Sequence, residues 1–253
     1  MKRTVRMFAW LLCLCMVFPM LVSCAKTEEV KEFTAEELQS EEYAEFVNGY
    51  DPENDTDLDA ERASAEDETL AGTSVQYSNS KLVSCPMPSP HKSSRNGQKI
   101  DTITIHMMGG QLTVETLGRL YSSASSQTSS NYGIDKDGRI GMYVDEKDRS
   151  WSSSNKANDM RAVTIEVASD PFAPYAVSDK AYAALIRLVT DVCQRNGIKK
   201  LVWSTDKNER IQHKNGANMT IHSDFANKAC PGEYLLDRMD DIAAEVNKNL
   251  GAE

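Results

Sequence analysis

Histidine is scarce in this sequence, and acidic residues outnumber basic ones. Its 253 residues include only four histidines, and 28 lysines and arginines stand against 38 acidic residues. No basic patch is interleaved with aromatic residues, so the composition excludes a typical nucleic-acid-binding protein. An internal repeat is also missing, so the chain is not built from repeated units. The few histidines restrict the search for metal ligands to a few positions.

Long apolar runs are missing everywhere except near the amino terminus. Residues 7–22 are apolar and follow three basic residues among the first six. This order is typical of a secretory signal, and the run is shorter than the about 20 residues that a transmembrane helix needs. The run closes at residues 21–24 with LVSC, which resembles a bacterial lipobox, in which the cysteine is diacylated and becomes the new amino terminus. We expect residues 1–24 to be a lipoprotein signal with Cys24 as the lipidation site. An ordinary signal or an uncleaved anchor is the alternative.

Acidic residues are concentrated in one segment. Between Ala25 and Glu68 there are 17 acidic and three basic residues, a net charge of -14, whereas the chain from Thr69 onward has 22 basic and 21 acidic residues. High net charge with few large apolar side chains favours disorder, so we expect residues 25–78 to be a disordered linker. A flexible coil of about 50 residues spans about 40 Å. We interpret it as a spacer rather than as an acidic partner-binding tail.

Strands and helices are expected to alternate in residues 79–253, which suffice for one domain with a substantial core. Alternating or β-branched runs predict strands at residues 101–106, 139–144, 162–167 and 200–204. Strands interleaved with helices indicate an α/β domain.

Three helices are predicted from their caps and from the spacing of apolar residues. Thr113 suits the start of a short helix, Ser178 can cap a longer one that ends at Gly197, and Pro231 suits the start of a final helix. Two polar stretches lack core-forming side chains and are expected to be loops, residues 122–130 and 150–158.

Two histidines and one cysteine form a pattern typical of metal ligands. His106 ends a predicted strand, and His222 and Cys230 are eight residues apart. Two imidazoles and a thiolate suit zinc, and three protein ligands leave a fourth tetrahedral position for water, as in a hydrolytic centre. Taken alone, His106 would more often be a structural histidine. His91 and His213 lie in polar segments, so we expect them to be exposed and exclude them as ligands.

Cys230 has an alternative interpretation as half of a disulfide. An exported protein permits such a bond with Cys85 or Cys193. Three cysteines in the expected domain cannot all pair. The simplest arrangement has Cys193 as a buried thiol, Cys230 as a zinc thiolate and Cys85 unassigned.

Four sequence blocks occur in the order found in a known enzyme family. They are TITIH at residues 102–106, SNYGIDKDGRI at 130–140, AVTIE at 162–166 and HSDFANKACPG at 222–232. Roughly residues 80–250 resemble the zinc N-acetylmuramoyl-L-alanine amidases, the family that includes phage lysozyme-type amidases and the peptidoglycan recognition proteins. Two further blocks, at residues 149–151 and 158–162, resemble its clostridial-type members.

The resemblance implies both a fold and an activity. The implied fold is a mixed central β-sheet with helices on both faces and Zn²⁺ held in a surface groove by His106, His222 and Cys230. The implied reaction is hydrolysis of the amide between N-acetylmuramic acid and the L-alanine of the peptidoglycan stem peptide. A non-catalytic peptidoglycan recognition module and a metallopeptidase acting on cross-bridges are the alternatives, although recognition proteins characteristically lose the cysteine ligand. We expect an exported monomer whose only membrane contact is its lipid anchor.

Two further residues are candidates for catalysis. Glu166 matches the carboxylate that acts as a base in several members of the family, and its apolar strand predicts burial, which raises a carboxyl pKa. Lys228 lies two residues before Cys230, as the family's catalytic lysine does, and could stabilise the oxyanion of the tetrahedral intermediate. The alternatives are an ordinary strand-end acid and a surface lysine.

Two positions depart from the family pattern. Ser130 stands where many members have a tyrosine, and Tyr132, two residues later on the same strand face, is a candidate substitute. Met107 replaces a frequent second histidine, which leaves the hydrogen-bond partner of the first ligand unidentified.

Acylation of Cys24 can be tested directly. Labelled palmitate should enter the chain in a bacterium that processes lipoproteins, and Cys24→Ala should abolish the label because the thiol accepts the lipid. Gel autoradiography of the captured chain measures this incorporation. Cys15→Ala is the control and should keep the label, because Cys15 leaves with the signal. Label that survives Cys24→Ala would contradict the assignment.

Overall fold

The computed structural model describes residues 76–252. The expected signal, Cys24 and almost all of the acidic linker lie outside the described residues. No helix within residues 76–252 has the length and apolar character that crossing a membrane requires.

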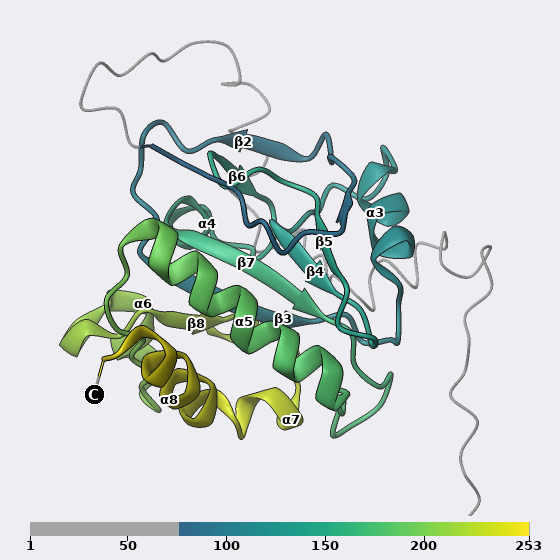
Figure 1. The fold of residues 1–253 in the computed structure, drawn as a ribbon. Coiled ribbons are helices and arrows are strands. Elements are labelled where there is room, and N and C mark those ends of the chain that lie inside the picture. Colours follow the sequence, from purple (N-terminus) through teal and green to yellow (C-terminus); the bar gives the residue numbers. More distant parts are fainter. Residues whose placement is uncertain (1–75, 253) are drawn as a thin grey trace, which may run out of the picture. The chain divides into compact units, whose positions relative to one another are not determined.

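A six-stranded sheet forms the centre of the domain (Figure 1). Its strands in spatial order are β1 (Cys85–Pro86), β5 (Ile140–Met142), β4 (Tyr132–Ile134), β7 (Ala162–Val167), β3 (Thr102–Met107) and β8 (Met219–Ile221). Every neighbouring pair is parallel except β4 with β5, so the sheet is mixed. A separate antiparallel pair joins β2 (Lys92–Ser94) to β6 (Asp148–Ser150).

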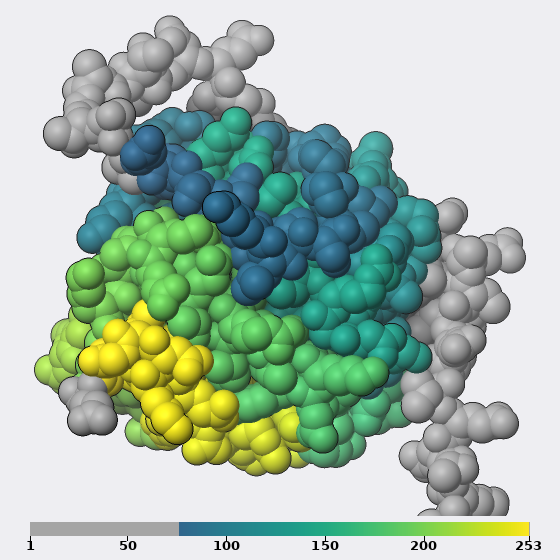
Figure 2. All heavy atoms as spheres, viewed as in Figure 1, coloured from purple at the N-terminus to yellow at the C-terminus, as the bar shows by residue number. Residues whose placement is uncertain are grey.

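Helices cover both faces of this sheet, which confirms the predicted fold class. The helices are α3 (Val114–Ser122), α4 (Lys156–Arg161), α5 (Asp179–Asn196), α6 (Lys207–Gln212), α7 (Glu233–Leu236) and α8 (Met239–Leu250), with 3-10 turns at η2 (Lys214–Gly216) and η3 (His222–Asp224). Helices α5 and α8 pack together over one face, and Figure 2 shows the yellow α8 lying against the green α5 at the surface.

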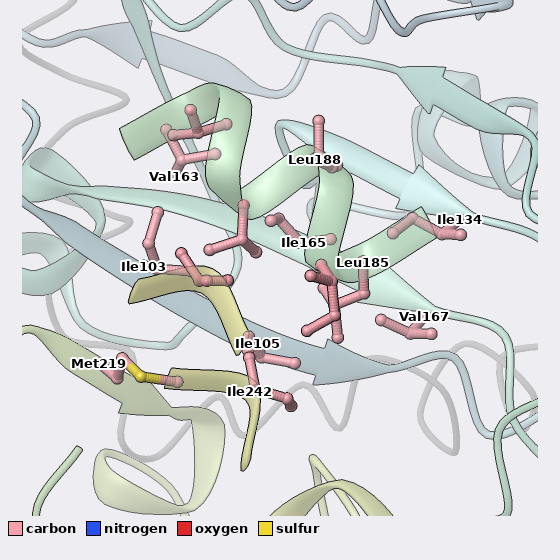
Figure 3. Close-up of a cluster of buried hydrophobic side chains, with 14 of the residues drawn as sticks. Ile103, Ile105, Ile134, Val163, Ile165, Val167, Leu185, Leu188, Met219 and Ile242 are labelled. Carbon is pink, nitrogen blue, oxygen red and sulfur yellow. The ribbon is translucent and has the colours of Figure 1, made fainter. Parts of the chain in front are cut away.

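The two faces of the sheet differ in character. Alternate residues of β3 and β7, such as Ile105 and Ile165, pack with Leu185 of α5 and Ile242 of α8 in the main apolar core (Figure 3). Because successive side chains of a strand point to opposite faces, the other face carries the intervening polar residues. Those residues are Thr104 and His106 of β3, Thr164 and Glu166 of β7, and Thr220 of β8.

Most predicted elements are confirmed. The strand predicted at 162–167 is β7 itself, and the strands predicted at 101–106 and 139–144 contain most of β3 and all of β5. Thr113 and Ser178 cap α3 and α5 as expected, each accepting a hydrogen bond from the backbone N–H three residues later. Gly197 ends α5 with φ of 70°, a conformation that glycine adopts without strain.

Three predictions of secondary structure are wrong. Residues 200–204 form no strand, because Asn247 and Asn218 side chains accept hydrogen bonds from the backbone N–H groups of Leu201 and Val202. The sheet edge is instead β8. The final helix is split into α7 and α8, and part of the stretch at 150–158 belongs to α4, which Asn155 caps.

The amino-terminal segment of the described chain is bound to the apolar side of the sheet. The backbone N–H of Ser80 donates to the Tyr132 hydroxyl, which itself donates to Glu146 at 2.7 Å. Glu146 is buried and also pairs with Arg195 of α5 at 2.6 Å. This network joins the start of the domain to its longest helix.

Candidate metal centre

Two parallel strands deliver the candidate histidines to one edge of the sheet. His106 is the fifth residue of β3, and His222 follows directly after β8, which lies parallel to β3. The turn after η3 returns Cys230 to the same place, where Ser223 N–H donates to Cys230 O at 3.2 Å. Donor atoms of His106, His222 and Cys230 all lie within 4.8 Å of one another. The structure therefore brings together the three residues that the sequence singled out.

The separation of Cys230 Sγ and His106 Nδ1 fits two ligands of a tetrahedral zinc ion. Cys230 Sγ lies 3.5 Å from His106 Nδ1. Zinc bonds of about 2.3 Å to sulfur and about 2.0 Å to nitrogen, at a tetrahedral angle, place the two donors about 3.5 Å apart. The backbone N–H of Met107 also donates to Cys230 Sγ at 3.4 Å, which fixes the sulfur beside β3. Both the donor types and their separation suit zinc.

Burial keeps all three candidate ligands uncharged. Burial, followed by the neighbouring His222, lowers the pKa of His106 well below its ordinary value. Burial and then Lys228 lower the pKa of His222 to about 4. Neutral imidazole is the form that coordinates metals. Burial and then Glu166 raise the pKa of the Cys230 thiol, so a cation must displace its proton to gain a thiolate.

Glu166 lies directly beside His106. The two residues are partners in the pairing of β7 with β3, and Glu166 Oε1 is 3.9 Å from His106 Nδ1. Only 4% of Glu166 is exposed, and its Oε2 has no hydrogen-bond partner among the described residues. Burial raises the pKa of this carboxyl well above its ordinary value. The predicted burial of Glu166 is confirmed, and the carboxyl is set up to hold a proton.

Lys228 is half-buried on the turn between His222 and Cys230. Its positive charge helps to lower the pKa of His222, so the ammonium group lies within electrostatic range of the cluster. The turn between His222 and Cys230 therefore supplies the positive charge of Lys228 near the cluster.

The structure corrects the expectation for Tyr132. Tyr132 pairs with Ile165 rather than with Glu166, so its side chain points to the apolar face, where its hydroxyl donates to Glu146. Ser130 donates to the carbonyl of Tyr132. A different tyrosine, the buried Tyr121 of α3, is near the site: burial and then Glu166 raise its pKa. The Tyr132 hydroxyl is therefore directed away from the cluster.

The structure also shows the environments of the other histidines and cysteines within residues 76–252. His91 is buried rather than exposed, and its Nε2 lies 2.8 Å from the Ser123 carbonyl. His213 is half-buried. Neither histidine belongs to the cluster. Cys85, Cys193 and Cys230 are all free, and Cys193 is buried as expected.

Sequence reasoning missed two serines that contact the candidate ligands. Ser152 Oγ lies 3.2 Å from His106 Nε2, and Ser154 Oγ lies 3.4 Å from His222 Nε2. From the sequence, residues 150–158 were recognised only as a polar stretch. Three consecutive serines carry no signal that tells which hydroxyl faces a ring.

These features define an α/β domain with a candidate metal site of two histidines and one cysteine. The chain belongs to the Amidase_2 family, described as N-acetylmuramoyl-L-alanine amidase, whose pattern matches residues 96–233. Membership of this family supports amidase activity on peptidoglycan.

Solved structures with a similar arrangement were also found. A selenomethionine derivative of AmpD has 18% identity and a TM-score of 0.49, covering 68% of this chain and 99% of its own. A mutant endolysin from Bacillus subtilis has 18% identity and a TM-score of 0.48, covering 64% and 97%. Drosophila peptidoglycan recognition protein SA has 16% identity and a TM-score of 0.43, covering 57% and 79%. A search of curated proteins found no match.

The raised pKa of Glu166 predicts how stability depends on pH. Above the ordinary value of 4.5, the folded chain retains a proton that the unfolded chain has lost, so rising pH destabilises the fold. The unfolding free energy of the metal-free wild type should fall relative to that of Glu166→Gln by at most about 1.4 kcal/mol per pH unit. Urea unfolding with a chelator present, from about pH 5 to about pH 8, measures this difference.

The comparison has an internal control. Both histidines are present in both chains, so only effects that depend on the Glu166 carboxyl remain in the difference between the two curves. Glu233 is exposed, and Glu233→Gln should follow the wild-type curve. Parallel curves for wild type and Glu166→Gln would show that the carboxyl is not perturbed.

Proposed function

We propose that this chain is a zinc-dependent N-acetylmuramoyl-L-alanine amidase that cleaves the bond between N-acetylmuramic acid and the L-alanine of the stem peptide. The observation that carries the proposal is the convergence of His106, His222 and Cys230 within 4.8 Å in a member of the amidase family. Three ligands leave one tetrahedral position open for water or substrate. Bound Zn²⁺ would polarise the scissile carbonyl and lower the pKa of a water molecule to about 7.

Glu166 is the proposed general base. Zn²⁺ bound beside Glu166 would favour its ionised carboxylate, which could then accept a proton from the attacking water and give it to the departing amine of L-alanine. Its position beside His106 puts the carboxylate next to the cluster rather than across the domain.

Lys228 is the proposed stabiliser of the oxyanion. The tetrahedral intermediate carries negative charge on the former carbonyl oxygen, and a fixed ammonium group offsets that charge. Its electrostatic influence on His222 supports this role.

The proposed chain organisation places this domain outside the cell. Residues 1–24 serve as a lipoprotein signal, lipidated Cys24 anchors the protein, and residues 25–78 act as a spacer for the domain at 79–253. Two acyl chains provide stable membrane attachment. The proposed protein is an exported, membrane-anchored monomer that faces the cell wall.

Zinc content and reaction products test the proposal. The full chain, purified in detergent, should bind one zinc ion, and Cys230→Ser should lose most of it because a thiolate ligand is removed. Cys85→Ser is the matched control, since Cys85 lies outside the cluster, and should retain zinc. Metal analysis measures both.

Mass spectrometry of digested peptidoglycan should show intact stem peptides with a free L-alanine amino terminus. Binding of peptidoglycan without any cleavage would instead identify a recognition module. Cleavage between amino acids of the cross-bridges would identify a metallopeptidase.

Turnover of variants tests the two catalytic roles. Glu166→Gln should lower kcat by about 10²- to 10⁴-fold, as expected for loss of a general base. Lys228→Met should lower it by about 10²- to 10³-fold, as expected for loss of an oxyanion stabiliser. Both should retain zinc, and the exposed Lys199→Met serves as the control with wild-type kcat. Undiminished kcat in either variant would remove that residue from the mechanism.

A further inference from the structure

One loop contacts both candidate histidines through serine hydroxyls. Ser152 Oγ is 3.2 Å from His106 Nε2, and Ser154 Oγ is 3.4 Å from His222 Nε2. For His106 the opposite ring nitrogen, Nδ1, faces Cys230 Sγ at 3.5 Å. The ring of His106 therefore lies between a hydroxyl on one side and the thiol on the other.

A buried carboxylate holds this loop in place. Asp159 of α4 is 1% exposed, and its Oδ2 accepts hydrogen bonds from the backbone N–H groups of Ser152 at 3.0 Å and Ser153 at 3.1 Å. Asn155 then caps α4 by accepting from Asn158 N–H at 2.9 Å. The loop is thus fixed at both of its ends to the same short helix.

The backbone at Ser154 adopts a costly conformation. Its φ is +58°, in the left-handed region that residues other than glycine, asparagine and aspartate rarely enter. Such a conformation persists only where the surrounding structure imposes it. Here it accompanies a hydroxyl that faces His222 Nε2. A glycine would adopt this backbone more easily but could not supply the hydroxyl.

We propose that Ser152 and Ser154 are positioning residues that orient the two imidazoles for metal binding. Each hydroxyl oxygen accepts a hydrogen bond from the ring Nε2–H, which fixes the tautomer and leaves Nδ1 with the lone pair that a cation needs. This inference rests on the proposed zinc centre. It identifies the ring partner left open by the methionine at position 107.

Ser153 provides a matched comparison within the same loop. Its hydroxyl donates to the Asn155 carbonyl at 3.3 Å and accepts from Asn158 Nδ2 at 3.1 Å, and within residues 76–252 it makes no hydrogen bond to a histidine ring. Removing the Ser153 hydroxyl changes the hydrogen bonds within the loop but removes no contact with a histidine ring. Loss of the Ser152 hydroxyl removes a contact to a ring.

Zinc affinity of the full chain, measured by competition with a chromophoric chelator, tests the inference. Ser152→Ala should weaken zinc binding by about 10-fold or more, the range seen when the hydrogen-bond partner of a metal-binding histidine is removed. Ser154→Ala should weaken it less, because the 3.4 Å contact is longer. Ser153→Ala should change zinc affinity by less than about 2-fold, because its hydroxyl bonds to Asn155 and Asn158 rather than to a metal-binding histidine.

Ser154→Gly separates positioning from loop stability. Glycine relieves the positive φ, so the thermal midpoint of the metal-free chain should stay the same or rise, while zinc affinity falls as in Ser154→Ala. A purely structural role for Ser154 would instead preserve or improve zinc affinity in this variant. Thermal unfolding with and without zinc records both quantities on the same samples.

The outcomes distinguish this inference from the proposed function. Wild type that binds no zinc overturns the zinc centre and the inference with it. If the wild type binds zinc and Ser152→Ala binds it equally tightly, only the positioning role is overturned. Equal losses in Ser152→Ala and Ser153→Ala also overturn it, since loop packing would then explain both. A loss confined to the ring-facing serines, with unchanged metal-free midpoints, supports it.

Discussion

The parallel alignment of β3, β7 and β8 is the constraint on which the candidate site depends. Parallel strands end at the same edge of a sheet, so residues near their carboxyl ends come together without any long side chain. His106 and Glu166 are register partners, and His222 follows the end of β8. A shift of one residue in the β3–β7 register would turn Glu166 to the apolar face and separate it from His106.

The same sheet must bury polar groups without leaving them unpaired. On the face opposite the apolar core, Thr104 and Thr220 share a hydrogen bond of 2.8 Å, and Asn158 of α4 bonds to both hydroxyls. Burial of a polar group costs free energy unless it is paired, so this network makes a polar sheet face tolerable. It also places α4 beside the cluster, where Asp159 can hold the serine loop. Structural and functional groups thus share one short helix.

The sequence predicted the long, periodic elements and the three converging donors. Strand β7, the caps of α3 and α5, and the burial of Glu166 follow from local patterns that residues 162–167, Thr113 and Ser178 display. The features that the sequence did not predict depend on tertiary contacts. The backbone of Leu201 pairs with an asparagine side chain from α8, and β8 is only three residues long. The orientation of Tyr132 depended on strand register, and the roles of Ser152 and Ser154 depended on a loop whose sequence is uniform.

The network around Tyr132 has a mechanical consequence. The Tyr77 hydroxyl donates to the Gln98 carbonyl, and Arg195 of α5 donates to the Ser78 carbonyl. The Ser80 N–H donates to the Tyr132 hydroxyl, which Glu146 links to Arg195. Tyr132 and the His106–Glu166 pair point to opposite faces of the sheet. Tension transmitted along the polypeptide from its amino-terminal side would therefore be shared between the contact of Tyr77 with the segment before β3 and the contacts with α5 and Tyr132.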